Sequence, residues 1–102
     1  MKVFHRTPCG SQIVAAGFKD NTGHYMLGIT LTGVFVSDKP LDLNEGAKGR
    51  DLLCLEIPEA VFSEFELVED EKPYREACIP ASVLNGFGNI ELLPDDFGFE
   101  VD

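Results

Sequence analysis

Proline divides this chain into short apolar runs, and that feature restricts its fold more than any other. The run 51–57, Asp-Leu-Leu-Cys-Leu-Glu-Ile, is rich in strand-forming residues and ends at Pro58, and the run 72–79 ends in the same way at Pro80. Because proline has no backbone N–H to give to a sheet ladder, each run is expected to end as a strand at that point. A transmembrane helix needs about 18 consecutive apolar residues, and no run approaches that length. The pattern therefore predicts a globular fold built from short strands.

The other strands are predicted where β-branched and aromatic residues lie between turn signals. The expected strands are 2–5, 33–37, 51–57, 65–70, 72–79 and 90–94. Residues 24–32 fit either a strand or a loop, and the cluster Asp20-Asn21-Thr22-Gly23 predicts a turn.

Helices are expected to be few and short. Ile13 and Val14 fit a helix that has Thr7 as its N-cap, Pro8 in its first position and Gly17 just after its last turn. Weaker signals predict single helical turns at 40–43 and 58–65, a loop at 44–49 and a turn at 80–87. The sequence thus predicts one α+β domain over residues 1–102, with two or three short helices and a mostly antiparallel sheet, whole or split into two.

Charge and cysteine usage limit the partners. The chain has 18 acidic and 8 basic residues, a formal net charge of −10 at pH 7, so most of its surface would repel a phosphate backbone. Cys9, Cys54 and Cys78 are odd in number and form no CxxC pair, which indicates reduced thiols and no zinc site. The N-terminus lacks the basic and long apolar segments of a signal peptide, so a cytoplasmic location without a membrane partner is expected.

The first candidate site is His5-Arg6-Thr7, which lies at the end of a predicted strand and just before a predicted helix. The unpaired N–H groups and partial positive charge of a helix start, together with Arg6, favour an anion such as a pyrophosphate. The alternative is a half-buried sheet histidine beside a surface arginine.

Two later strands carry the other candidates. Phe35 follows Gly33 in a short strand and fits either a ring that stacks on a flat ligand or a core residue. In the run 72–79, alternation places Tyr74, Glu76 and Cys78 on one face. Glu76 would stabilise an oxocarbenium-like centre if that face lines a cleft, or pair with a neighbouring base if the face is exposed.

The order of these segments resembles the ADP-ribosyltransferase superfamily, most closely its histidine-containing branch of diphtheria toxin and poly(ADP-ribose) polymerases, whose fold RNA 2′-phosphotransferases share. In that branch a first strand ends in His-Gly-Ser or His-Gly-Thr, and a helix ending in Gly-Leu or Gly-Phe follows. A Gly-Ile/Val-aromatic strand comes next, and a glutamate lies on a late strand. Here the corresponding segments read Phe-His-Arg-Thr, Ile-Val-Ala-Ala-Gly-Phe, Gly-Val-Phe-Val-Ser and Tyr-Arg-Glu-Ala-Cys-Ile, within residues 3–85.

The resemblance implies a role for each matching position. His5 would hydrogen-bond a ribose hydroxyl of NAD, the backbone at Arg6 would meet the nicotinamide carboxamide, and Thr7 would supply the hydroxyl of the motif. Phe35 would stack on the nicotinamide ring, and Glu76 would bind the 2′-hydroxyl of its ribose and stabilise the cationic transition state. Two further positions are expected at the pocket rim: Ser37 and Asn44.

Two positions depart from the pattern of the family. Arg6 replaces the customary glycine, and its side chain would either crowd the carboxamide pocket or grip an additional phosphate with two hydrogen bonds. Phe35 stands where that branch often has tyrosine, so the ring is kept and the hydroxyl is lost.

The function that the resemblance implies is cleavage of the nicotinamide N-glycosidic bond of NAD, as an ADP-ribosyltransferase or an NAD glycohydrolase, in a toxin or effector. Its expected partners are NAD as substrate, an acceptor that is protein rather than nucleic acid, and an antitoxin or other protein. The alternatives are a catalytically degenerate module of the same fold that binds a nucleotide or a protein, and an enzyme like the RNA 2′-phosphotransferases.

Overall fold

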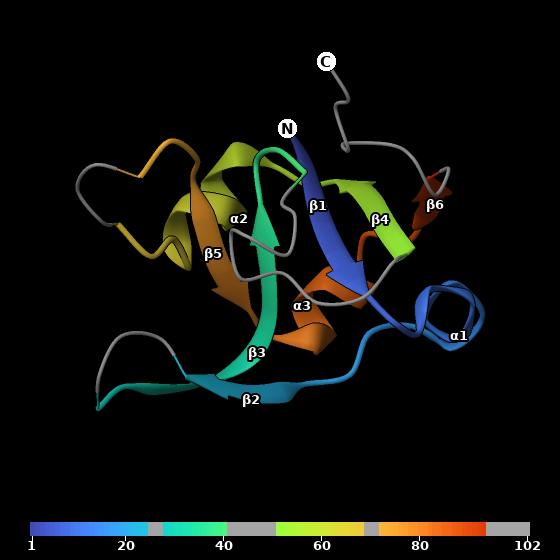
Figure 1. The fold of residues 1–102 in the computed structure, drawn as a ribbon. Coiled ribbons are helices and arrows are strands. Elements are labelled where there is room, and N and C mark those ends of the chain that lie inside the picture. Colours follow the sequence, from blue (N-terminus) through green and yellow to red (C-terminus); the bar gives the residue numbers. More distant parts are fainter. Residues whose placement is uncertain (25–27, 41–50, 69–71, 94–102) are drawn as a thin grey trace, which may run out of the picture.

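The computed structural model describes residues 1–24, 28–40, 51–68 and 72–93 (Figure 1). This part of the chain forms six strands and three short helices, which confirms the α+β class and the mostly antiparallel sheet. In chain order the elements are β1 (Lys2–Thr7), α1 (Gly10–Ala16), β2 (Asn21–His24), β3 (Thr30–Ser37), β4 (Asp51–Glu56), α2 (Glu59–Glu64), β5 (Glu76–Ile79), α3 (Ala81–Asn85) and β6 (Glu91–Leu93).

The strands lie in the order β2-β3-β1-β4-β6, and β5 pairs with β3 as well. Strands β1 and β4 pair along their whole length, from Lys2 opposite Glu56 to Thr7 opposite Asp51. In contrast, β1 meets β3 at a single register pair, Phe4 opposite Ser37. The two strands thus form few backbone contacts with each other, so a side chain of one strand can reach the backbone of the other.

Strand β3 changes its partner at Gly33. Residues 30–33 pair with β2, whereas residues 34–37 pair with β5. Gly33 has a φ of +155°, and a methyl group there would lie 2.9 Å from the Cys78 sulfur and 3.1 Å from the Ile79 carbonyl oxygen. Only glycine therefore lets β3 and β5 approach this closely at the point where the partner changes.

The core lies between the sheet and the helices α2 and α3, which lie behind the sheet in Figure 1. Its side chains come from alternate positions of the strands and from the buried face of each helix. The buried core cluster consists of Val3, Phe18, Val34, Val36, Leu53, Leu55, Ile57, Phe62, Ala77, Ile79, Ala81 and Leu84.

Several element boundaries were predicted wrongly. The predicted turn at Asp20–Gly23 is mostly strand β2, because pairing with the extended β3 outweighs the turn preference of Asn and Gly. The predicted turn at 80–87 contains helix α3, whose first N–H, from Ala81, donates to the Asp20 carboxylate at 2.7 Å. A local sequence window cannot show such a distant acceptor.

The late strands are shorter than predicted. In the expected strand 65–70, the described residues form one isolated bridge, between Glu66 and Ala77. The run 72–79 is extended strand only from Glu76 onward. The helical turn predicted at 40–43 falls mostly, and the loop at 44–49 entirely, outside the described residues.

None of the helices in the described ranges is long and apolar enough to cross a bilayer. All three cysteines are free thiols: Cys9 is exposed, Cys78 is half-buried and Cys54 is buried.

Candidate functional site

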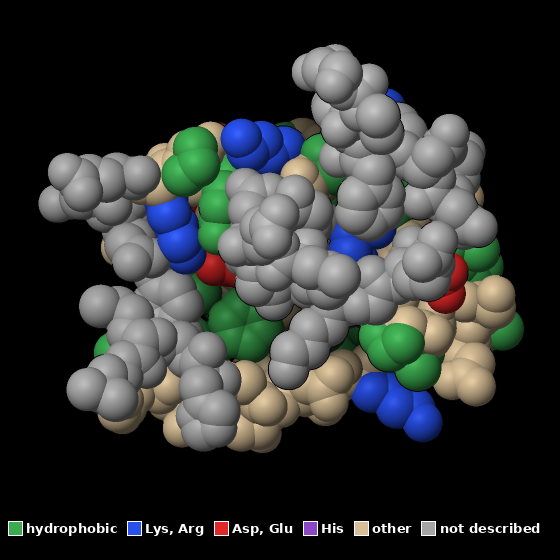
Figure 2. All heavy atoms as spheres, in the orientation of Figure 1, with side chains coloured by type: hydrophobic (Ala, Val, Ile, Leu, Met, Phe, Trp, Pro, Cys, Tyr) green, Lys and Arg blue, Asp and Glu red, His purple; other side chains and the backbone are tan. Residues whose placement is uncertain are grey.

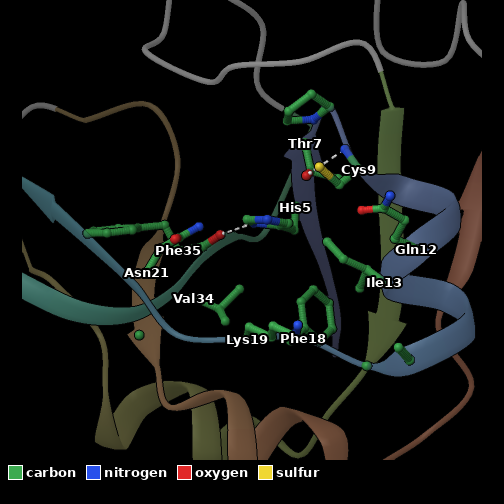
Figure 3. Close-up of a pocket in the computed structure, with 14 residues that line it drawn as sticks. His5, Thr7, Cys9, Gln12, Ile13, Phe18, Lys19, Asn21, Val34 and Phe35 are labelled. Atoms are coloured by element: carbon green, nitrogen blue, oxygen red, sulfur yellow. Dashed lines mark hydrogen bonds between the residues drawn. The ribbon is translucent and has the colours of Figure 1, made fainter.

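A cavity of about 380 Å³ opens between the end of β1, the helix α1 and the region where β2 meets β3 (Figure 3). Its volume suits part of a nucleotide or another small ligand. The residues that line it come from four segments of the chain: His5, Thr7, Pro8, Cys9, Gln12, Ile13, Ala16, Gly17, Phe18, Lys19, Asn21, Gly33, Val34 and Phe35.

His5 is fixed in one orientation in this cavity. Its Nδ1 donates to the Phe35 carbonyl oxygen at 2.7 Å, across the gap between β1 and β3 (Figure 3). The edge of its ring meets the Phe18 ring, with a centroid separation of 5.6 Å and an interplanar angle of 80°. Burial lowers the pKa of His5 below its ordinary value and outweighs the opposing effect of the Phe35 hydrogen bond. The imidazole is therefore neutral at pH 7, and its Nε2 is a hydrogen-bond acceptor suited to a hydroxyl group.

The start of α1 differs from the prediction. The helix begins at Gly10 with Cys9 as its N-cap, so Thr7 and Pro8 precede it. The Thr7 hydroxyl accepts the Cys9 N–H at 3.1 Å, and the Asp51 carboxylate accepts the Gly10 N–H at 2.9 Å. Asp51 could not be recognised from the sequence, because it comes from β4, 41 positions along the chain from Gly10. The protein itself thus supplies the negative charge that was expected from a bound anion.

Phe35 is half-buried, and its ring rests on the backbone of β2. A methyl group at Gly23 would lie 2.8 Å from Cε2 of that ring, so glycine is needed for the ring to sit there. Phe35 is therefore not one of the buried core residues, so the interpretation of this ring as a core residue is wrong.

Glu76 lies on the strand next to Phe35. In the β3–β5 register, Ser37 is opposite Glu76 and Phe35 is opposite Cys78. Since paired residues in an antiparallel ladder point to the same side, Phe35, Ser37 and Glu76 share one face of the sheet. The Ser37 hydroxyl donates to the Lys39 carbonyl oxygen at 2.7 Å, so this rim hydroxyl already has an acceptor.

The Glu76 carboxylate also has a resident partner. Lys72 Nζ donates to Glu76 Oε1 at 2.9 Å, and the same ammonium lies 5.3 Å from the centre of the Tyr74 ring. The two charged side chains are 21% and 16% exposed, so this ion pair is shielded from much of the solvent. In the space-filling view, basic and acidic side chains adjoin in the area of β5 (Figure 2).

The backbone before Glu76 is held by Arg75 and Asp38. The Arg75 N–H donates to the Asp38 carboxylate at 2.9 Å, and the Asp38 N–H donates to the Arg75 carbonyl at 3.0 Å. The Arg75 guanidinium binds both oxygens of Glu66 and one of Glu59, which raises the pKa of Arg75 and lowers that of Glu66. These contacts fix where β5 begins, and so where Glu76 lies along β3.

The structure brings some of the predicted site residues together and separates others. His5, Thr7 and Phe35 line the cavity, whereas Glu76 and Ser37 do not, among the described residues. Phe35 belongs to both groups, since it also shares a face with Glu76. Arg6 does not line the cavity and is only 8% exposed, so it is not a surface charge. Asn44 lies outside the described residues.

Other residues of the site were not predicted. Gln12, Lys19 and Asn21 line the cavity with polar groups, but no motif marks them. The only sequence signal for Lys72 was its spacing of four residues from Glu76, which predicts contact in a helix and not in a bent segment before a strand. In the described ranges, no three His, Cys, Asp or Glu side chains gather as a metal site would need.

Comparison of the chain with protein-family models, with curated proteins and with solved structures finds no match.

Proposed function

We propose that this protein binds NAD around Phe35 and cleaves the bond between nicotinamide and ribose, as an ADP-ribosyltransferase or NAD glycohydrolase with an ADP-ribosyltransferase-like split sheet. The observation that supports this proposal most directly is that Phe35 belongs to two parts of the candidate site. It lines the cavity of His5 and Thr7, and it shares a face with Ser37 and Glu76. Phe4, which is opposite Ser37, shares the face of Glu76, whereas the neighbouring His5 points to the other face of β1. A ligand that contacts both places therefore has to be elongated, as a dinucleotide is.

The cavity would take one end of the ligand. Its volume of about 380 Å³ is enough for part of a dinucleotide but small for the whole molecule. The neutral His5 offers Nε2 to a sugar hydroxyl, while its Nδ1 stays bonded to the Phe35 carbonyl. The other end of the ligand would lie on the face of Phe35 and Glu76.

The chemistry assigned to Glu76 is electrostatic. As the N-glycosidic bond breaks, nicotinamide leaves with the bonding electron pair and positive charge develops on the ribose. A carboxylate placed beside that sugar stabilises this charge, and the pairing of β5 with β3 keeps the backbone of Glu76 in place. Water or a side chain of the acceptor then forms the new bond to the same carbon and releases a proton.

The test is release of free nicotinamide from NAD, measured by chromatography. We expect release by the wild type and a decrease of about 10²–10³-fold in Glu76→Gln, the range found when one group that stabilises transition-state charge is removed. Glu64→Gln is the matched control, because Glu64 is an exposed residue of α2, and it should keep full activity. A wild-type protein that releases no nicotinamide, with or without a protein acceptor, contradicts the proposal.

A second candidate is a module that binds the nucleotide without cleaving it. The observation in its favour is that Glu76 does not line the cavity, among the described residues. In that case NAD raises the melting temperature, because it stabilises the folded state, while nicotinamide stays bound to the ribose.

A further inference from the structure

The Lys72 ammonium lies close to both a carboxylate and an aromatic ring. A carboxylate oxygen of Glu76 lies 2.9 Å from the nitrogen, and the Tyr74 ring centre lies 5.3 Å from it. A negative charge beside an aromatic face is the combination that binds ammonium and other organic cations in proteins. We call the Tyr74 ring and the Glu76 carboxylate the cation niche.

We propose that the cation niche is a binding site for an organic cation, and that Lys72 occupies it until the ligand displaces the lysine ammonium. This inference deepens the proposed function and rests on it for the identity of the ligand, since the pyridinium ring of NAD is an organic cation next to the bond to be cleaved. Lys72 would then act as an internal competitor of the substrate.

Electrostatics makes the two cations compete. With an ammonium at 2.9 Å, the charge of the carboxylate is largely compensated, so a second cation gains little from Glu76 while Lys72 stays. The lysine charge is carried on a flexible four-carbon chain, so side-chain rotation moves it away from Glu76 without a change of the backbone. Solvent does little to weaken the pair, because its side chains are only 21% and 16% exposed.

The backbone that carries Glu76 is held by contacts that do not involve Lys72. The Glu76 carbonyl accepts the Leu67 N–H at 2.8 Å, and Arg75 is tied to Asp38 through both of its backbone groups. Glu76 therefore keeps its place on β5 when the lysine leaves. The ring of Pro73 restricts the backbone φ angle between Lys72 and Tyr74.

The experiment measures the affinity of two small probes by isothermal titration. 1-Methylnicotinamide is a pyridinium cation, and nicotinamide is its neutral counterpart. We expect Lys72→Met to bind 1-methylnicotinamide about 3–30-fold more tightly than the wild type, which corresponds to about 0.7–2 kcal/mol. Its affinity for nicotinamide should change less than about twofold, because a neutral ring does not compete with the ammonium.

Controls separate this effect from a general loss of positive charge. Lys39→Met removes an exposed lysine near Ser37, where only the backbone carbonyl of Lys39 makes the hydrogen bond to Ser37, and should leave both affinities unchanged. Lys72→Gln repeats the test with a polar side chain in case Lys72→Met folds poorly. Tyr74→Leu in the Lys72→Met background should lose most of the gain for the cation.

Each outcome bears on the inference separately from the proposed function. Equal or weaker binding of 1-methylnicotinamide by both Lys72 variants, or an equal gain for nicotinamide, overturns the inference. If the wild type releases nicotinamide from NAD but the Lys72 variants do not bind 1-methylnicotinamide more tightly, the inference is overturned and the proposed function stands. A gain without release keeps the cation niche and rejects the cleavage of NAD.

Discussion

At the scale of single residues, Phe35 is used through both its backbone and its side chain. Its carbonyl oxygen accepts the Nδ1 proton of His5, and its ring rests against Gly23. His5, Thr7 and Phe35 could be predicted from the sequence because strand ends and short motifs mark them. Gly23 and Asp51 could not, because their roles depend on which strand lies opposite.

The half-buried, neutral His5 should make stability depend on pH. Its pKa in the folded protein lies below the ordinary value of 6.5, so the unfolded chain takes up a proton first as the pH falls. The stability present above pH 6.5 is therefore lost as the pH falls through the lower pKa of the folded state. We expect His5→Asn, whose amide can still donate to the Phe35 carbonyl, to lose less stability over this range. Urea denaturation at a series of pH values measures the free energy of unfolding of both proteins. An equal decrease of this free energy with pH in the wild type and in His5→Asn would contradict the prediction.

At the scale of elements, β3 holds the site together because it pairs with β2 along one half and with β5 along the other. The change of partner at Gly33 sets Phe35 beside both strands. The strand 33–37 could be predicted from its β-branched residues, but its extension back to Thr30 could not, because only pairing with β2 makes that segment a strand.

Gly33→Ala should destabilise the protein by about 1–3 kcal/mol, because the new methyl group meets the Cys78 sulfur and the Ile79 carbonyl and the backbone is strained. Gly28→Ala is the control for backbone strain alone, since Gly28 has a φ of +83° and none of the described residues places an atom within 4 Å of its added methyl group. The double variant Gly33→Ala/Cys78→Ala should recover part of the loss. Urea denaturation measures the free energy of unfolding of these three variants. A Gly33→Ala protein as stable as the wild type would show that β3 and β5 can separate without loss of stability.

At the scale of the whole molecule, composition and strand patterns were sufficient for the α+β class, and four of the six strands in the described part were predicted near their positions. Strand β2, helix α3 and the true start of β5 were missed, because distant partners determine them: β3 for β2, Asp20 for α3, and Asp38 for β5. Such contacts leave no periodic trace in a single sequence.

The net charge of −10 should make stability depend on salt. Repulsion among like charges opposes the compact state, and added ions screen it. We expect the melting temperature to rise by a few degrees when sodium chloride is raised from about 0.02 M to about 0.5 M, where the screening length falls below about 5 Å. Differential scanning fluorimetry checks this, and a melting temperature that falls instead would indicate that attractive pairs such as Arg75–Glu66 outweigh the repulsion.

The carboxylate of Asp51 lies beside the start of α1 and is not itself among the described residues that line the cavity, but it makes the two ends of the cavity electrostatically different. It places an acid at the end where Cys9 and Gly10 begin the helix, while Lys19 lines the wall beyond the helix end. If the cavity binds a ligand with a charged tail, we expect its anionic part to lie toward Lys19 and its uncharged part toward Thr7 and Cys9.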